Sequence, residues 1–573
     1  MRKFFLGVLV GGVVAVFGIF IIVLVIGRLA ASRQPTIAPN SALVLTLQGG
    51  IPEVPPVDIP LPFAQAQSEP TVRDLWASLH AAATDNRIKA VILQPRDLSA
   101  GWGKLQEIRE ELVNFKTSGK PVYAMLAGGG SREYYLASVA DRIFLQPDDT
   151  LDVKGFLLEA MYLKNALDKL GIDIQVDHIG RYKDAGDIFT KANMSPETRE
   201  VLGQVLDQLY ADFCSTVGQG RHKTADEIRA LVDQGPFIAA QAKSSGLVDE
   251  LGYEDQVYGE LKKKVGGELN RTSIKTYFRA VPGRGDHIAM LVGAGEIQRG
   301  EPDGSLNQND VIASAAFVRT IRQVRNDSSI KGVILRIDSP GGDAGASDEI
   351  LHQLKLLSRV KPVVVSMSDY AASGGYFISV TGDPIVAYPD TVTGSIGVLY
   401  IRPNVRNLYN KLGIQEELLM RGKLADLDSE SEPLSDAGRQ KLHESIQATY
   451  TSFVSKVAAA RKKSYDQIDP LAQGRVWMGA QARQNGLIDE LGGLNRAIAL
   501  VRRRAHLSPT GDTNLITYPP RRTLLDILTS SPADVFADAI AERKLRQALP
   551  ALPSRLLLKG GVLRILPYRL EIR

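Results

Sequence analysis

The chain has 573 residues, of which 44% are hydrophobic and 23% are charged, and its formal net charge is +4. This length predicts two large domains or three to four smaller ones, and the composition is that of an ordinary globular protein. The near balance of charge gives no indication of nucleic-acid binding. A single cysteine, Cys214, excludes an intrachain disulfide and a site built from several thiolates. We expect neither a metal nor a cofactor.

The N-terminal segment predicts a membrane anchor. Residues 4–27 carry no charged side chain, and as a helix they would span about 36 Å, enough for a tilted bilayer crossing. Residues 1–3 would then be a cytoplasmic N-terminus and residues 28–40 a linker. The small residues at 30–32 leave a cleaved signal peptide as an alternative. No second apolar run of this length follows, so we expect one anchor that carries a large soluble body.

The rest of the chain contains an internal duplication. The sequence Gly-Leu-Val-Asp-Glu-Leu-Gly at residues 246–252 recurs as Gly-Leu-Ile-Asp-Glu-Leu-Gly at residues 486–492, and Lys-Pro-Val at residues 120–122 recurs at residues 361–363. The offset stays near ~240 residues, which indicates a repeated domain. We predict a first repeat over residues 41–280, a second over residues 281–508, and a tail over residues 509–573 of unknown role.

Strands and helices are predicted to alternate within each repeat. In chain order, apolar runs and helical periodicity predict strands at residues 174–179, 287–292, 332–337 and 362–366, with helices at residues 311–324 and 347–358. Continuous apolar strands separated by helices are typical of a parallel sheet covered by helices. The predicted fold class is therefore α/β.

Two glycine-containing loops distinguish the second repeat from the first. The second repeat has Asp-Ser-Pro-Gly-Gly-Asp at residues 338–343 and Ala-Ala-Ser-Gly-Gly-Tyr at residues 371–376. The first repeat has Gln-Pro-Arg-Asp at residues 94–97 and Gly-Ser-Arg-Glu-Tyr-Tyr at residues 130–135. A purely structural need would place the same loops in both repeats. The difference indicates a functional site in the second repeat.

Ser373 is the candidate nucleophile within these loops. It follows a predicted strand and opens a predicted helix, and its small neighbours allow a substrate backbone to approach closely. The N–H groups of Gly374 and of Gly341 or Gly342 are candidate donors to an oxyanion.

A serine nucleophile needs a base, and Lys183 is the candidate. None of the seven histidines stands in a recognisable catalytic context. Lys183 lies in Gly-Arg-Tyr-Lys-Asp-Ala at residues 180–185, just after a predicted strand, where sites on parallel sheets gather. A lysine acts as a base only when neutral, so its pKa would have to fall from the usual value of about 10.4.

Taken together, these motifs resemble a known protease family. The set comprises both glycine loops, Arg-Tyr-Lys-Asp at residues 181–184, Thr-Gly-Ser-Ile-Gly at residues 393–397 and the repeated Gly-Leu-Val/Ile-Asp-Glu-Leu-Gly. From residue 41 to about residue 504, and in its N-terminal anchor, the chain resembles the long, duplicated form of signal peptide peptidase A, of the S49 family of serine proteases.

The resemblance implies roles for five residues. Ser373 would be the nucleophile, and Lys183 would be a general base that reaches it from the other repeat. Ser395 would orient the lysine, and Gly374 and Gly342 would donate to the oxyanion.

The resemblance also implies a setting. It predicts tandem crotonase/Clp-protease-like domains, a ring-like homotetramer and hydrophobic peptide substrates such as remnant signal peptides. It places the anchor in the lipid of a bacterial inner membrane and the catalytic body on the periplasmic side.

Three alternatives remain open at this point. Lys423 is the internal counterpart of Lys183 and lies in the same repeat as Ser373, so it is a second candidate base. A crotonase-type acyl-CoA enzyme would share the oxyanion-hole architecture but would need an acidic or histidine base. A non-catalytic scaffold would require the second repeat to have lost its activity as well.

Overall fold

The computed structural model describes residues 35–54, 69–281, 283–302, 311–520 and 561–565, together with Gly11 and Gly18. The predicted anchor, residues 4–27, lies outside this part of the chain apart from those two glycines. Among the residues described, no helix is both long enough and apolar enough to cross a bilayer.

The first repeat folds around a parallel sheet, as its sequence pattern predicts. The strand order among the described residues is β8-β4-β3-β2-β1-β9, and all neighbouring strands are parallel. The strands are β1 (Ser41–Gly49), β2 (Ile88–Leu98), β3 (Val122–Leu126), β4 (Arg142–Leu145), β8 (Glu250–Leu251) and β9 (Asn270–Ser273), and a separate antiparallel pair is formed by β5 (Thr150–Leu151) and β7 (Phe237–Ile238).

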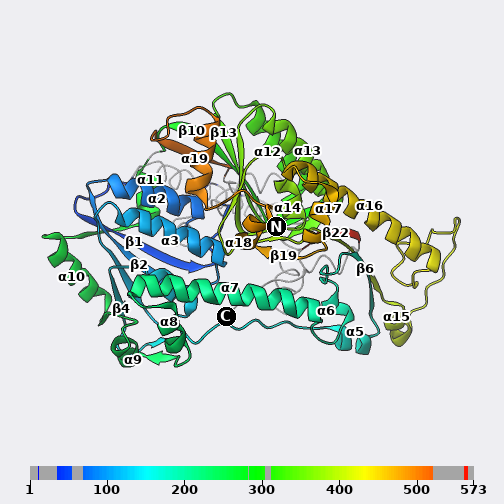
Figure 1. The fold of residues 1–573 in the computed structure, drawn as a ribbon, viewed down its shortest axis with the longest axis horizontal. Helices are drawn as coiled ribbons and strands as arrows, with labels where there is room; N and C mark the ends of the chain where they lie inside the picture. The colour runs from blue at the N-terminus through cyan, green and yellow to red at the C-terminus, as the bar shows by residue number, and fades with distance from the viewer. Residues whose placement is uncertain are drawn as a thin grey trace.

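Helices cover both faces of this sheet, which explains why its strands are apolar throughout. Helix α10 packs against one face of the sheet, at its outer side in Figure 1, whereas α2, α3, α4 and α7 contribute to the separate hydrophobic cluster of the other face. The helices are α2 (Val72–Thr84), α3 (Trp102–Lys116), α4 (Ser131–Ala137), α5 (Lys164–Leu170), α6 (Asp187–Thr190), α7 (Pro196–Arg221), α8 (Ala225–Val232), α9 (Ala239–Ser244), α10 (Glu254–Val265) and α11 (Ile274–Ala280).

The second repeat follows the same plan, which confirms the predicted duplication. Its sheet has the order β19-β17-β15-β13-β10-β21, with β16 and β20 added beside β15. The strands are β10 (Asp286–Ala294), β13 (Gly332–Ser339), β15 (Val363–Ala372), β16 (Ile385–Ala387), β17 (Val392–Gly394), β19 (Val476–Met478), β20 (Glu490–Leu491) and β21 (Thr513–Tyr518). The helices are α12 (Ser314–Asn326), α13 (Ala344–Ser358), α14 (Gly374–Ser379), α15 (Arg406–Leu412), α16 (Asp436–Arg461), α17 (Tyr465–Ile468), α18 (Gly479–Asn485) and α19 (Leu494–Arg504), with a 3₁₀ turn at Asp469–Leu471.

Three details differ from the sequence-based expectation. The region predicted as one helix over residues 311–324 begins as strand β12 (Val311–Ala313) before α12, because it pairs with β11 (Glu296–Gln298). The Ser-Pro-Gly-Gly turn continues into a short strand, β14 (Gly341–Asp343). The second sheet extends past residue 508, because β21 pairs with β10 as β9 pairs with β1.

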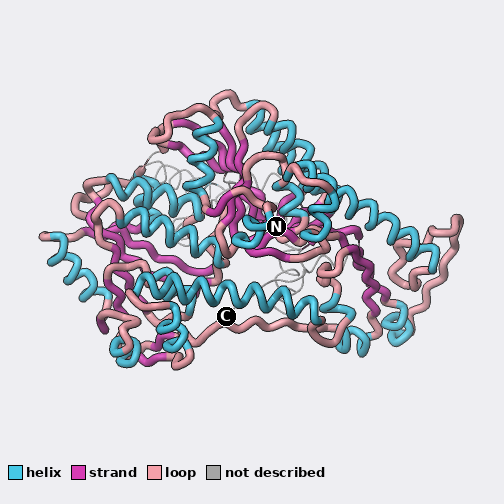
Figure 2. Tube along the Cα trace, in the orientation of Figure 1, coloured by secondary structure: helices cyan, strands magenta, loops and turns pink. Residues whose placement is uncertain are grey.

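A third sheet joins the two repeats. Its order is β12-β11-β14-β22-β18-β6. Strand β6 (Asp173–Ile179) of the first repeat pairs antiparallel along its whole length with β18 (Val398–Asn404) of the second. Strand β22 (Gly561–Ile565) lies between β14 and β18. Figure 2 shows β6 extending away from the two main sheets, with helical segments beside it.

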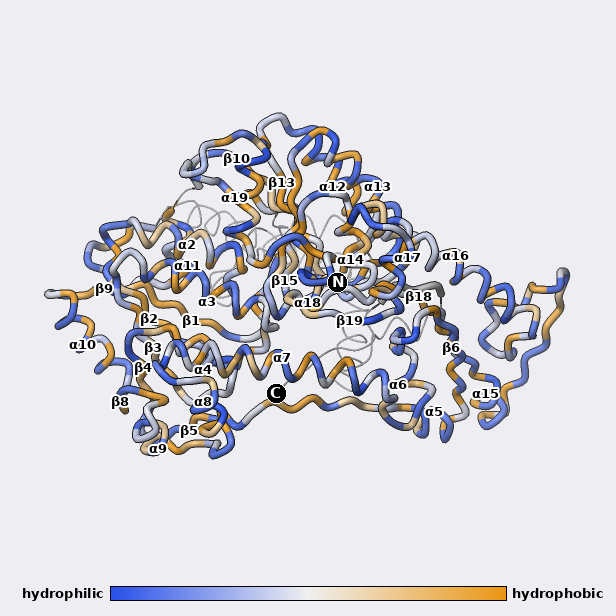
Figure 3. Tube along the Cα trace, in the orientation of Figure 1, coloured by the Kyte–Doolittle hydropathy of each residue, from blue (hydrophilic) through white to orange (hydrophobic). Residues whose placement is uncertain are grey.

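The hydrophobic core is also continuous across the repeats. The cluster that fills the first repeat includes Ile288, Met290, Ile334 and Val364 from the second sheet. Figure 3 shows the apolar residues concentrated along the sheet strands, whereas helices such as α7 alternate apolar and polar residues. The repeats therefore pack as layers of one body through the faces of their sheets and helices.

A buried ion-pair network crosses the same interface. The Arg336 guanidinium on β13 is fully buried and donates to Glu53 and Glu107, two carboxylates of the first repeat. It also donates to the hydroxyls of Ser366 and Ser368 on β15. Burial raises the pKa of Glu107. The charges of Arg336 and Lys104 outweigh burial at Glu53 and hold the pKa of its carboxyl below its usual value.

Lys104 extends this network toward the glycine loops. Its Nζ lies 2.7 Å from an Asp338 carboxylate oxygen and 3.5 Å from Asp369. The Asp369 carboxylate accepts from the backbone N–H groups of Gly101 and Lys104 and so caps the start of α3. Asp338 directly precedes the Ser-Pro-Gly-Gly loop, so the first repeat holds the base of that loop.

We expect Arg336→Met to destabilise the protein by about 3–5 kcal/mol, because two buried carboxylates would lose their cation. Arg319→Met is the matched control, since Arg319 pairs with Glu301 on the surface and exposed pairs contribute about 0–1 kcal/mol. Chemical denaturation of both variants measures the difference. Equal free energies of unfolding for the two variants would contradict this role of the network.

Candidate active site

Ser373 occupies the junction between strand β15 and helix α14. It is fully buried and has a φ of 52° and a ψ of −113°, a region that residues other than glycine rarely adopt. Its N–H donates to the Gly394 carbonyl at 2.8 Å, and its own carbonyl accepts from the N–H of Phe377. A conformation of this kind persists only where the surroundings enforce it, and such residues cluster at functional sites.

The two glycine loops pack directly on each other. A Cβ on Gly375 would lie 2.5 Å from the Ser339 carbonyl oxygen, so α14 approaches the Ser-Pro-Gly-Gly loop more closely than any side chain allows. Gly342 has a φ of 152°, and a Cβ there would lie 2.0 Å from the Ile297 carbonyl oxygen. Both positions therefore require glycine for steric reasons. The serine turn and the Ser-Pro-Gly-Gly loop are therefore neighbours in the structure.

Lys183 reaches the same region from the first repeat. It lies just after β6, and the N–H of the adjacent Tyr182 donates to the Gln473 carbonyl at 2.8 Å. A Cβ on Gly474 would lie only 2.6 Å from Lys183 Cβ. The lysine loop is thus seated against residues 473–475 of the second repeat.

The lysine contacts both predicted serines. Its Nζ lies 2.9 Å from Ser373 Oγ, 3.0 Å from Ser395 Oγ and 3.2 Å from the Ser395 carbonyl oxygen. All three residues are fully buried. Ser395 has a φ of 49°, and its N–H donates to the Arg475 carbonyl. The structure therefore places Ser373, Lys183 and Ser395 within hydrogen-bonding distance of one another through the Lys183 amine.

The alternative base, Lys423, lies elsewhere. It is exposed in the loop that precedes α16, whereas Ser373 is fully buried against Lys183. The geometry therefore favours Lys183 over Lys423.

Asp184, next to the lysine, is also buried. Burial raises the pKa of its carboxyl to about 6, although a hydrogen bond from the Thr198 hydroxyl opposes the rise. Asp184 thus joins the lysine loop to the start of α7, the helix that crosses toward the first sheet (Figure 1).

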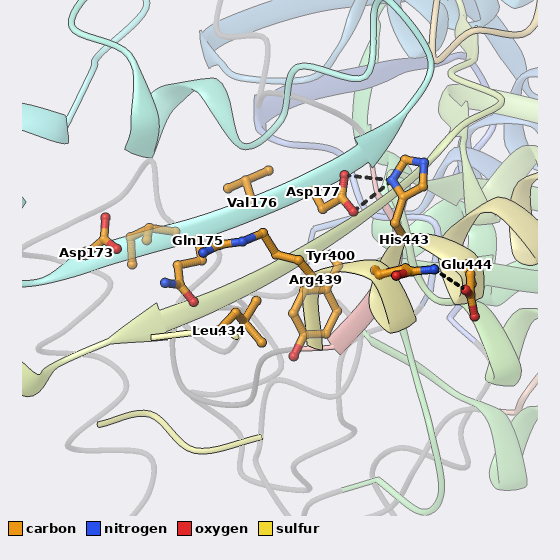
Figure 4. Close-up of a pocket in the computed structure, with 11 residues that line it drawn as sticks. Asp173, Gln175, Val176, Asp177, Tyr400, Leu434, Arg439, His443 and Glu444 are labelled. Atoms are coloured by element: carbon orange, nitrogen blue, oxygen red, sulfur yellow. Dashed lines mark hydrogen bonds and ion pairs between the residues drawn. The ribbon is translucent and has the colours of Figure 1, made fainter. Parts of the chain in front are cut away.

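A pocket of about 720 Å³ lies apart from these residues, along the β6–β18 pair and the start of α16 (Figure 4). His443 and Asp177 meet across it at 3.1 Å and belong to different repeats. Neither Ser373 nor Lys183 lines this pocket, so it is not the predicted site.

The sequence motifs did not predict the residues that support the site. Residues 473–475 receive the lysine loop, and Lys104 and Asp369 hold the base of the glycine loops. One signal was present: the first repeat has Gln-Gly-Pro at residues 234–236 where the second has Gln-Gly-Arg at residues 473–475. The ion pairs of Lys104 with Asp338 and Asp369 have no comparable motif in the sequence.

Comparison with known proteins places the chain in a peptidase family. The model of peptidase family S49 matches residues 114–268 and 355–508, one segment in each repeat. A chloroplastic serine protease SPPA of Arabidopsis thaliana is 35% identical over 90% of this chain and 76% of its own length. Protease 4 of Salmonella typhi is 34% identical over 81% of this chain and 76% of its own. Protease 4 of Haemophilus influenzae is 32% identical over 82% and 77%, respectively.

We expect Gly342→Ala to lower kcat about 100-fold or more, because the added Cβ must displace the loop that is predicted to carry an oxyanion donor. Gly382→Ala is the matched control: Gly382 also has a positive φ, but nothing lies within 4 Å of its added Cβ. Steady-state kinetics with a peptide substrate, alongside thermal unfolding, compares the two. A Gly342→Ala enzyme with normal kcat would exclude a role for this loop in turnover.

Proposed function

The chain belongs to peptidase family S49 and is a serine protease, and we propose that it works through a Ser373–Lys183 dyad on hydrophobic peptides such as remnant signal peptides. The observation that carries the proposal is the 2.9 Å contact between Lys183 Nζ and Ser373 Oγ. Full burial supports the role of base, because removal from water disfavours the charged form of a lysine.

The proposed reaction begins with proton transfer from Ser373 Oγ to the neutral Lys183 amine. The oxygen attacks the peptide carbonyl carbon, and the N–H groups of Gly374 and Gly342 stabilise the oxyanion. As the C–N bond breaks, Lys183 returns the proton to the leaving amine. Lys183 then deprotonates a water molecule that hydrolyses the acyl-enzyme, and the serine regains its proton.

Ser395 is proposed to position the lysine. Its hydroxyl lies 3.0 Å from Lys183 Nζ, and its carbonyl accepts from the same amine. These two contacts fix the direction of the amine, so that its remaining hydrogen-bonding position faces Ser373 Oγ.

We further propose that residues 4–27 anchor the protein in a bacterial inner membrane, with the catalytic body on the periplasmic side and with homotetramers as the working assembly. The uncharged N-terminal run supports the anchor. The motif resemblance to signal peptide peptidase A supports the substrate class, the location and the tetramer.

The dyad is tested by hydrolysis of a fluorogenic hydrophobic peptide. We expect Ser373→Ala and Lys183→Met to lower kcat by about 10⁴-fold or more, since a dyad acts as a unit. Lys423→Met is the matched control and should retain wild-type turnover. Loss of activity in Lys423→Met but not in Lys183→Met would place the base within the second repeat and contradict the proposal.

Ser395→Ala should lower kcat by about 10- to 100-fold with little change in KM, because the lysine keeps its contact with Ser373 but loses one fixed partner. Equal kcat in Ser395→Ala and wild type would show that the hydroxyl does not position the lysine.

A further inference from the structure

Arg475 of the second repeat directs its side chain at the first repeat. Its guanidinium donates to a Glu200 carboxylate oxygen at 2.8 Å and to the side-chain oxygen of Gln204 at 2.8 Å, both on α7. Its Cζ lies 4.8 Å from the centroid of the Tyr182 ring and 4.7 Å from that of the Trp477 ring. The side chain is only 13% exposed. The guanidinium therefore contacts two aromatic rings and is bound to α7 at its edge.

The tyrosine in this cluster directly precedes the proposed base. Lys183 follows Tyr182 in the sequence, and the N–H of Tyr182 donates to the Gln473 carbonyl at 2.8 Å. A Cβ on Gly474 would lie 2.6 Å from both the backbone nitrogen and the Cβ of Lys183. Residues 473–475 thus meet the lysine loop through a carbonyl, a close backbone approach and a guanidinium. A substitution can remove the guanidinium contact without altering the two backbone contacts.

The main chain of Arg475 also holds a neighbour of the lysine amine. Its carbonyl oxygen accepts from the N–H of Ser395 at 2.7 Å, and the Ser395 hydroxyl lies 3.0 Å from Lys183 Nζ. Arg475 directly precedes β19, which pairs with β17, and the Gly394 carbonyl at the end of β17 accepts from the N–H of Ser373. One residue therefore links the lysine loop, the serine that contacts the lysine and the strand that holds the nucleophile.

The duplication provides an internal comparison for this cluster. Where the second repeat has Gln-Gly-Arg-Val-Trp at residues 473–477, the first has Gln-Gly-Pro-Phe-Ile at residues 234–238. Where the first repeat has Arg-Tyr-Lys at residues 181–183, the second has Arg-Gly-Lys at residues 421–423. Of the two lysine loops, only the one that reaches the serine has the tyrosine, the arginine and the tryptophan. A need of the fold alone would place the cluster in both repeats.

We propose that Arg475 is a positioning residue that holds Lys183 at Ser373 by means of its guanidinium. The inference rests on the proposed serine–lysine dyad and adds a residue that sets the geometry of that dyad from outside it. A guanidinium suits this role because its planar face stacks on aromatic rings while its edge donates in fixed directions. Movement of the lysine loop would break the contact with Tyr182, so the contact opposes such movement.

Peptide turnover by Arg475→Met in the full chain tests this role. Methionine keeps an unbranched side chain but removes the planar cation. We expect kcat to fall about 10- to 100-fold, because a misplacement of about 1 Å at a reacting group can lower a rate about 100-fold. We expect KM to stay within about twofold of wild type, because the change alters proton transfer and leaves peptide binding intact.

Arg271→Met is the matched control for this variant. Arg271 has its Cζ 3.8 Å from the centroid of the Tyr258 ring and pairs with Glu254 at 3.0 Å, all within the first repeat. It thus loses the same kinds of contact away from the dyad and should retain wild-type turnover. Rates are compared at a temperature at which thermal unfolding shows every variant to be folded. Equal kcat in Arg475→Met and Arg271→Met would overturn the positioning role.

Substitution of Tyr182 shows whether Arg475 acts through the ring. Tyr182→Leu removes the ring, whereas Tyr182→Phe removes only a hydroxyl that lies 3.5 Å from Glu200. We expect Tyr182→Leu to lose kcat as Arg475→Met does and Tyr182→Phe to recover most of that loss. The double variant Arg475→Met with Tyr182→Leu should stay within about twofold of the slower single variant, because both changes break one contact.

Two results of this series would overturn the inference. Losses that multiply in the double variant would show two independent structural effects. Equal kcat in Tyr182→Leu and Tyr182→Phe would show that the ring does not position the lysine, and this comparison still applies if Arg475→Met fails to fold.

Lys183→Met in the same assay separates this inference from the proposed dyad. Loss of turnover in Lys183→Met together with wild-type kcat in Arg475→Met would overturn the role of Arg475 and leave the dyad in place. Wild-type turnover in Lys183→Met would overturn the dyad and, with it, the positioning role.

Discussion

The contact between Lys183 and Ser373 is the constraint on which the rest of this structure depends. The two side chains come from different repeats, and their 2.9 Å separation has to be held by everything between the repeats. Proton transfer is sensitive to shifts of this size, because a misplacement of about 1 Å can lower a rate 100-fold. A duplicated chain with a split site therefore needs a stiff interface. The shared hydrophobic core and the β6–β18 pairing both cross that interface.

The buried charges at the interface serve alignment rather than stability. Burying ion pairs is costly, and apolar residues of equal volume often stabilise a protein as well or better. Apolar contacts, however, tolerate sliding, whereas the fork of Arg336 fits Glu53 and Glu107 in only one register. The Lys104–Asp338 ion pair aligns the repeats in the same way and lies closer to the site, because Asp338 directly precedes the loop that contains Gly342. We interpret the network as the element that sets the position of one repeat on the other.

Much of this arrangement was predictable because the chain carries its own internal comparison. The duplication and the α/β class followed from repeated motifs and apolar periodicity, and Ser373 followed from a loop that only one repeat has. The short strands β12 and β14 were not predicted, because pairing with distant residues overrides local periodicity. Lys104, Asp369 and residues 473–475 were missed for a related reason. Their roles arise from contacts between segments far apart in the sequence, and no local pattern encodes such contacts.

Each repeat contributes a different side chain to the Lys183–Ser373 contact. The first repeat lacks the Ser-Gly-Gly loop, yet its lysine loop docks on residues 473–475 of the second. The second repeat has a counterpart lysine, Lys423, but that residue is exposed, while strand β18 of the same repeat pairs instead with β6 of the first. That pairing places one edge of β18 against the first repeat, whereas the other edge pairs with β22. The surface that brings Lys183 to Ser373 therefore also joins the two repeats in one sheet.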